Sequence, residues 1–270
     1  MQPSGRLVVV GAGDVGGEVA RRWVGGGGEA VGFTASTARH QELAAAGVEP
    51  RVGEAAEILR PDDRVLLSTS GSESQRLRVE ALAGTTVRRA VMTGSTGIYG
   101  AARGRIDEAT PPGAGGRARA SAEAEAAFRA WAPQGVTLRL GGLYRRGRGP
   151  LQPLLRRGEP PSGPPDRALV LIHRDDAVRA LLAALTHPHP DTIYLAVTPP
   201  APRRDIFYRE ACRLHGLPEP SFGDPVGPGE AASGPGPDGT GAAAWYDVSR
   251  LRRDLLPDPA HPDWHEAVQG

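Results

Sequence analysis

The chain has 270 residues, a formal net charge of +1 and a hydrophobic content of 39%, which suits a folded α/β sheet with a smaller second lobe. All 32 basic residues are arginine and they are scattered along the chain, so we expect no nucleic-acid partner. The absence of lysine also excludes any mechanism that needs one.

Cysteine, histidine and hydropathy exclude further classes. Cys212 is the single cysteine, so an internal disulfide and a cysteine metal site are excluded. His261 and His265 have the spacing of a metal pair, but Pro262 lies between them and no third ligand is evident, so we expect no metal. The chain has no signal-peptide core and no stretch of about 18 apolar residues, so we expect a cytoplasmic protein without a membrane partner.

The first predicted strand, residues 7–10, leads into Gly-Ala-Gly-Asp-Val-Gly at 11–16 and then a helical pattern at 18–24. In such a turn the first glycine permits the tight bend, the second lets a pyrophosphate approach, and the third lets the helix pack on the strand. Free N–H groups and the helix dipole would face the phosphates. A purely structural turn is the alternative. The predicted dinucleotide contacts are Gly11, Gly13, Asp14, Val15 and Gly16.

The second predicted strand spans residues 30–34, and its end selects the cofactor. An acidic residue there would bind the adenosine ribose and favour NAD(H). Hydroxyls and an arginine stand in its place and could hold a 2′-phosphate, so we expect NADP(H) to be favoured over NAD(H). An ordinary polar loop before a helix at 41–46 is the alternative. The selecting residues are Thr34, Ser36, Thr37 and Arg39.

Three further strands are predicted at residues 48–52, 63–70 and 87–93, with a helix at 74–82 between the last two. Small polar residues at the carboxyl end of a parallel strand suit a loop that passes close to a cofactor. We therefore expect Thr69, Ser70 and Thr93 to contact it.

Four motifs then follow in order: GSTGIYG at 94–100, GRIDEATPP at 104–112, VTLRLGGLYRRGRGPL at 136–151 and LIHRDDAVRALLAAL at 171–185. Together they resemble the extended short-chain dehydrogenase/reductase superfamily, in particular its atypical, epimerase/dehydratase-like branch. The resemblance covers about residues 6–220.

This resemblance implies an α/β Rossmann fold with a doubly wound parallel sheet. It implies an NAD(P)-binding domain over residues 1–145 and a smaller substrate lobe over 146–270, with a return to the sheet at about 169–197. Residues 223–243 are rich in glycine and proline and predict a long loop or disordered insert.

The superfamily usually catalyses with a Tyr-x-x-x-Lys pair on the helix that here covers about residues 117–128. One register puts Gly115 and Arg119 at the two positions, and a shift by two puts Arg117 and Ser121 there. Neither register supplies the pair, so the usual proton-transfer groups are absent.

The remaining catalytic candidates lie in the loop after residue 93. The resemblance implies that Ser95 or Thr96 binds a substrate oxygen, with a strand-end cap as the alternative. Tyr99 is the best surviving general acid, with packing as the alternative. Asp107 and Glu108 are expected to anchor the loop.

The resemblance implies that residues 136–151 pass the nicotinamide at Gly141 and then enter the substrate lobe. Tyr144 and the arginines at 145, 146 and 148 line up with substrate positions, and Arg145 and Arg148 could clamp an anionic group. Solvated loop arginines are the alternative. The resemblance makes His173 and Asp176 structural organisers, with a catalytic dyad as the sharper reading.

We therefore expect an NADP-dependent oxidoreductase that acts on a small polar substrate, of an anionic kind if the arginines bind it. A sensor that binds the cofactor without turnover is one alternative. A lyase, dehydratase or isomerase in the same fold is another. The resemblance implies a homodimer formed through helices, but the segment 118–130 is alanine-rich rather than strongly apolar, so a monomer or a homodimer is expected.

Overall fold

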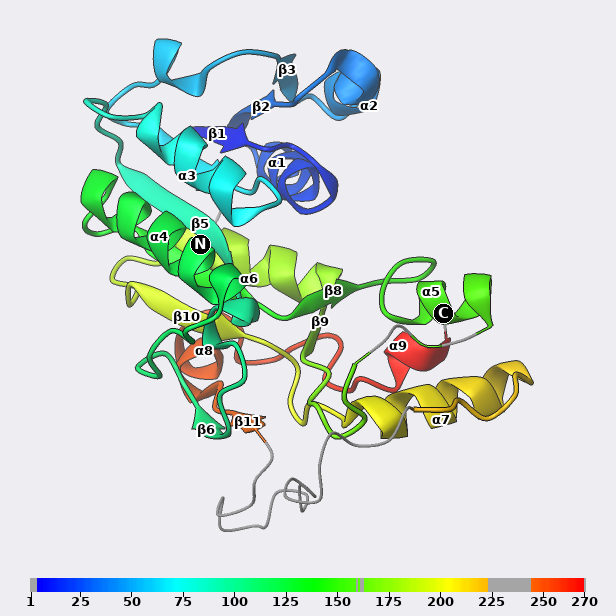
Figure 1. The fold of residues 1–270 in the computed structure, drawn as a ribbon. Helices are drawn as coiled ribbons and strands as arrows, with labels where there is room; N and C mark the ends of the chain where they lie inside the picture. The colour runs from blue at the N-terminus through cyan, green and yellow to red at the C-terminus, as the bar shows by residue number, and fades with distance from the viewer. Residues whose placement is uncertain (1–3, 159, 161–162, 223–243, 270) are drawn as a thin grey trace.

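The computed structural model describes residues 4–158, 160, 163–222 and 244–269. Its centre is a parallel seven-stranded sheet in the order β10-β7-β5-β4-β1-β2-β3 (Figure 1). The strands are β1 (Arg6–Val10), β2 (Glu29–Phe33), β3 (Glu49–Arg51), β4 (Arg64–Leu67), β5 (Arg89–Ser95), β7 (Val136–Leu140) and β10 (Ile193–Ala196).

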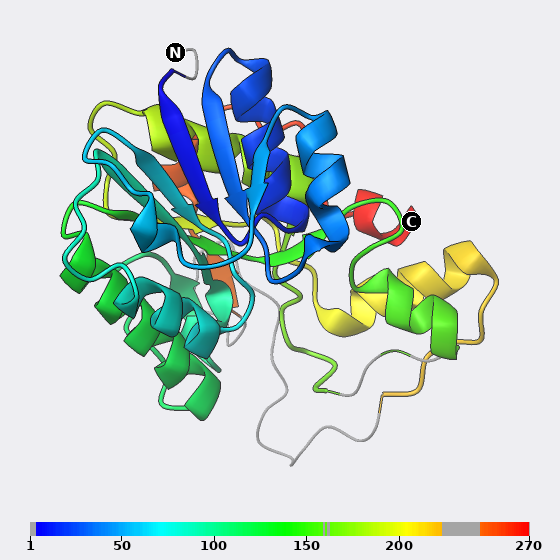
Figure 2. The same ribbon diagram turned by 90° about the horizontal axis from the view of Figure 1, so that it is seen from above.

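Helices cover both faces of the sheet because its strands are apolar on both sides (Figure 2). Leu7 and Val9 of β1 belong to the same buried cluster as α1 (Asp14–Gly25) and α6 (Arg174–Thr186). Val8 and Val10 belong to the cluster under α3 (Ser72–Glu80) and α4 (Gly116–Trp131). This alternation follows from the two-residue period of a strand. The short α2 (His40–Ala45) packs beside β3.

The smaller lobe has its own core, which includes Tyr144, Phe207 and Trp264. Its helices are α5 (Leu151–Arg157), α7 (Arg204–His215) and α9 (Glu266–Gln269). The parallel pair β8 (Gly142–Tyr144) and β9 (Leu171–His173) leads into it, and β6 (Gly104–Ile106) pairs with β11 (Ala244–Tyr246).

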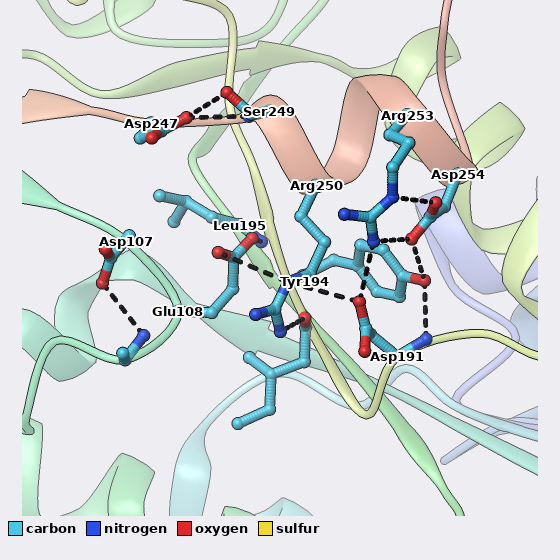
Figure 3. A network of polar contacts seen from close by, with 12 residues as sticks. Asp107, Glu108, Asp191, Tyr194, Leu195, Asp247, Ser249, Arg250, Arg253 and Asp254 are labelled. Atoms are coloured by element: carbon cyan, nitrogen blue, oxygen red, sulfur yellow. Dashed lines mark hydrogen bonds and ion pairs between the residues drawn. The ribbon is translucent and has the colours of Figure 1, made fainter.

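Hydrogen bonds to side chains outside the sheet hold the edge strand β10 in place (Figure 3). Tyr194 accepts from the Asp191 backbone N at 2.7 Å and donates to Asp254, at the end of α8 (Ser249–Asp254), at 3.0 Å. Leu195 N–H donates to Glu108 Oε1 at 3.0 Å. An edge strand has no neighbour on one side, so this carboxylate takes up a hydrogen bond that a further strand would otherwise accept.

The fold class is confirmed, and the strands expected from the sequence are present within a few residues of their expected limits. The sequence reading missed β6 and α5, which are short. The chain returns to the sheet at β10, which lies within the expected range of about 169–197. The expected insert at 223–243 lies outside the described residues. No helix in the described ranges is long and apolar enough to cross a membrane.

Candidate functional site

The glycine turn after β1 lies where the order of the sheet reverses. The chain builds β1, β2 and β3 outward and then crosses back to place β4 on the other side of β1. In open parallel sheets, ligands bind at the carboxyl ends of the strands beside such a point. The turn and the segment after β4 meet here, because a Cβ on Gly11 would lie 2.7 Å from the Ser68 carbonyl carbon.

The three glycines differ in what surrounds them. Gly11 has a φ of +93°, which favours glycine, and a Cβ on Gly16 would collide with the Gly11 carbonyl oxygen. A Cβ on Gly13 would meet no atom of the residues that the structure describes within 4 Å. Gly11 and Gly16 are therefore required by the protein itself, whereas the protein leaves the space in front of Gly13 open. This is the pattern expected if a ligand approaches the backbone at Gly13.

Asp14 begins α1 at the same turn and carries a cluster of charges. Its Oδ1 lies 3.1 Å from Arg174 and 3.4 Å from Arg145, and its Oδ2 lies 3.1 Å from Arg148. Burial alone would raise the pKa of Asp14, but the hydrogen bond from Arg174 and the charges of Arg145 and Arg148 outweigh it and lower the pKa. The sequence did not single out Arg174, because nothing local links residue 174 to residue 14.

The predicted cofactor-selecting loop follows β2. Ser36 and Thr37 are exposed, whereas Thr34 donates to the Ser36 carbonyl at 2.8 Å and so shapes the loop. Arg39 lies beside the glycine turn, with Nη1 3.4 Å from the Ala12 carbonyl oxygen, and it forms a bidentate ion pair with Glu42. Arg39 thus lies next to the glycine turn, on the same loop as the exposed Ser36 and Thr37, and Glu42 competes for its guanidinium.

The predicted cofactor contacts on β5 and in the segment after β4 differ in whether their side chains are free to bind a ligand. Ser70 is exposed, and the buried Oγ1 of Thr69 has no hydrogen-bond partner among the described residues. A buried hydroxyl without a partner is unusual and fits a position that a ligand completes. Thr93 is turned inward instead, since its hydroxyl donates to the Leu67 carbonyl at 3.3 Å and Gln75 donates to its carbonyl. The geometry gives no support to a cofactor contact by Thr93.

The substrate-oxygen candidates lie at the end of β5. Ser95 is exposed, and its Oγ accepts from Gly97 N at 3.1 Å, so it caps η3 (Thr96–Tyr99). A Cβ on Gly97 would lie 3.9 Å from Arg117 Cδ, which places Arg117 beside this turn. Arg119 is exposed and lies 3.7 Å from Glu123. Two registers of α4 could match the Tyr-x-x-x-Lys positions. The register with Arg117 and Ser121 is the one that has a residue beside the loop, because Arg117 lies there and Arg119 does not.

Tyr99 lies inside the protein. Its side chain is 1% exposed, its hydroxyl donates to the Asp107 carbonyl at 2.9 Å, and Arg139 donates to it at 2.9 Å. Burial raises the pKa of Tyr99, although the Arg139 hydrogen bond opposes the shift. Its position supports the packing alternative and gives no support to proton transfer to a substrate. Asp107 also accepts from the Thr110 backbone N at 3.1 Å, as expected of a loop anchor.

Gly141 and Tyr144 have structural neighbours that explain them. A Cβ on Gly141 would lie 2.9 Å from the Leu171 carbonyl carbon, so the approach of β9 requires glycine there. Tyr144 is buried, and its hydroxyl donates to the Asp263 carbonyl at 3.2 Å. Neither contact points to a cofactor or substrate, and both assignments stay predictions.

His173 and Asp176 make structural contacts in and around α6, which fits the organising role that the resemblance implies. His173 Nδ1 accepts from Asp175 N at 3.2 Å and caps α6. Asp176 is 1% exposed and accepts from the backbone N of Ala260 and of His261 at 2.8 and 2.9 Å. No cluster of three metal-ligating side chains occurs among the residues that the structure describes.

Sequence comparison gives a partial match. No protein-family model matches the chain. Protein YeeZ of Escherichia coli (strain K12) is 31% identical over 138 residues, which cover 50% of this chain and 49% of that protein. The chain thus spans about half the length of the curated relatives it matches.

Solved structures match nearly the whole chain. A conserved protein of unknown function from Silicibacter pomeroyi has a TM-score of 0.76 and 22% identity, covering 98% of this chain and 97% of that one. An NAD-dependent epimerase/dehydratase from Methylobacillus flagellatus, so named provisionally, has a TM-score of 0.70 and 22% identity, covering 100% and 97%. MoeE5 in complex with UDP-glucose and NAD has a TM-score of 0.73 and 19% identity, covering 98% and 96%. The chain therefore has the Rossmann fold of the NAD-dependent epimerases and dehydratases, as its resemblance to the extended short-chain dehydrogenases/reductases implied.

Proposed function

We propose that the chain binds NADP(H) at the glycine turn and uses it in an oxidoreductase reaction on a small polar substrate. The observation that carries this proposal is the open space at Gly13, between two glycines that the protein itself requires. The unpartnered hydroxyl of Thr69, on the neighbouring segment, supports it. Structures of the same fold hold NAD together with nucleotide sugars.

The preference for NADP(H) is supported by the loop after β2. Ser36, Thr37 and Arg39 would hold the 2′-phosphate, because a guanidinium and two hydroxyls can all donate hydrogen bonds to its oxygens. Arg39 lies within reach of the glycine turn. Glu42 weakens the preference, because Arg39 must exchange this carboxylate for the phosphate.

A bound nicotinamide would supply or accept the hydride. The protein's part at the reacting end is to orient the substrate oxygen, and we assign this to Ser95, Thr96 and Arg117. A Ser95 hydroxyl that accepts from Gly97 N still has its own hydrogen to donate. Arg117 adds a fixed positive charge beside the turn, which stabilises a developing oxyanion without giving up a proton.

A sensor that binds the cofactor without turnover is the second candidate. One observation favours it. Tyr99 is buried, and its hydroxyl accepts a hydrogen bond from Arg139 and donates one to the Asp107 carbonyl. Substrate-dependent oxidation of bound NADPH would exclude the sensor.

Fluorescence titration of the purified chain with NADPH and NADH tests the proposal. We expect micromolar binding of NADPH and weaker binding of NADH. If neither dinucleotide binds, the glycine turn is only structural and the oxidoreductase proposal fails. If NADH binds as tightly as NADPH, the cofactor site stands and the assigned preference is wrong.

A further inference from the structure

Two of the arginines around Asp14 are presented by one tight hairpin of the smaller lobe. Arg145 and Arg148 each donate a backbone hydrogen bond to the other's carbonyl, both at 2.9 Å. Gly147 at the tip has a φ of +72°, which permits the turn. Side chains of directly opposed antiparallel residues project from the same face. Both guanidinium groups therefore reach the one carboxylate at the start of α1.

The third arginine comes from the opposite direction. Arg174 begins α6, and its guanidinium bridges Asp14 at 3.1 Å and Glu18 at 3.4 Å along one face of α1. We call Arg145, Arg148 and Arg174 the arginine cluster. Its members come from the loop after β8 and from α6, and they meet at the helix turn that follows the glycine-rich segment.

The charges of this cluster are unbalanced at Asp14. Three guanidinium groups surround one carboxylate, and Glu18, the second acid, also binds Arg21 and Arg22. Within the described part of the chain, the buried Nε of Arg145 has no hydrogen-bond partner. Buried donors nearly always have an acceptor. The cluster thus has spare positive charge and a spare donor beside the turn with open space at Gly13.

We infer that the arginine cluster binds the pyrophosphate of the dinucleotide, and that Arg145 and Arg148 are cofactor ligands rather than a substrate clamp. This inference rests on the proposed function. Arginine suits the task because its planar guanidinium pairs with two phosphate oxygens at once. Without these arginines, the negative charge of Asp14 in the first turn of α1 would repel the pyrophosphate. With the arginine cluster, the net charge at this turn is positive. Asp14 holds the arginines in place and competes with the phosphates for them.

The test is calorimetric titration of the full chain with ADP-ribose, which carries the pyrophosphate, and ligand-observed NMR with adenosine, which does not. We expect Arg145→Ala/Arg148→Ala to bind ADP-ribose about 10- to 100-fold more weakly. Its adenosine affinity should stay unchanged. Arg157→Ala, an exposed arginine of α5, is the control and should bind both probes as the wild type does.

The Asp14→Asn variant distinguishes two roles of the arginine cluster. The cluster could bind the pyrophosphate, or its ion pairs with Asp14 could only hold the smaller lobe against α1. If Asp14 competes with the pyrophosphate, this variant binds ADP-ribose several-fold more tightly. If the ion pairs only hold the lobe in place, Asp14→Asn and the double arginine variant lose affinity together, and the inference is wrong. It also fails if the double variant binds ADP-ribose as the wild type does. If the wild type itself does not bind ADP-ribose, the proposed function falls as well.

Discussion

The Arg139 guanidinium donates to the Tyr99 hydroxyl at 2.9 Å, inside the protein and below the loop that follows β5. Arg139 also forms a bidentate ion pair with Glu125 of α4, and it donates to the Glu108 carbonyl at 3.3 Å. One buried cation therefore joins β7, α4 and the loop at 95–108. We conclude that this network positions the candidate catalytic loop.

Tyr99→Phe should lower stability and leave turnover nearly unchanged. The substitution removes one hydroxyl and leaves the Asp107 carbonyl and an Arg139 N–H without their partner, which costs about 1–3 kcal/mol. Urea denaturation measures the first effect and NADPH oxidation the second. A loss of turnover of about 100-fold with normal stability would instead identify Tyr99 as the general acid.

Glu125→Gln should destabilise the protein by about 3–5 kcal/mol, because it leaves the buried Arg139 charge uncompensated. Glu123→Gln on the same helix is the matched control. Glu123 is exposed and lies 3.7 Å from Arg119, so its replacement should change stability by less than about 0.5 kcal/mol. Urea denaturation of both variants decides the matter, and equal midpoints would show that the buried pair contributes nothing.

Glu42→Gln should tighten NADPH binding by up to about fivefold and leave NADH binding unchanged. Exposed ion pairs contribute up to about 1 kcal/mol, and Arg39 no longer has to give one up. Arg39→Ala should reduce the affinity for NADPH toward that for NADH. Fluorescence titration with both dinucleotides measures this. Equal changes for NADPH and NADH would mean that the loop after β2 does not read the 2′-phosphate.

Stability should fall in acid partly through Glu18. Burial alone would raise the pKa of Glu18, but hydrogen bonds from Arg21 and Arg22 lower it from 4.5 to about 2. Because the folded pKa lies below the unfolded value, the contribution is complete above pH 4.5 and is lost as pH falls towards 2. Urea midpoints of Glu18→Gln should therefore fall less steeply over this interval than those of the wild type. Glu123→Gln is the control, and parallel curves for Glu18→Gln and the wild type would contradict the account.

The central sheet could be predicted because strands such as β1 and β4 are largely apolar and buried runs. The glycine turn could be predicted because the turn geometry gives each glycine a local reason. The strand β6 has three residues, too few to show a period. Its pairing with β11 depends on contacts far apart in the chain.

The candidate site was predictable only where the signal is local. Asp14 and Arg148 are 134 positions apart, and Tyr99 and Arg139 are 40 apart. Neither pairing leaves a pattern in one sequence. The substrate role of Arg145 and Arg148 and the acid role of Tyr99 both stay predictions. The sequence likewise leaves two registers open for α4, because the position of Arg117 beside Gly97 depends on how the helix packs in the fold.

The most direct test of the central claim is an NADPH titration of Gly13→Ala beside the wild type, with thermal unfolding of both. A Cβ at Gly13 meets no atom of residues 4–158, 160, 163–222 and 244–269 within 4 Å, so the melting temperature should stay nearly constant. The same methyl group occupies the space where the pyrophosphate would approach, so NADPH affinity should fall at least about tenfold. Unchanged NADPH affinity in a normally stable Gly13→Ala variant would contradict the account. It would mean that the pyrophosphate of the dinucleotide does not lie against the Gly13 backbone.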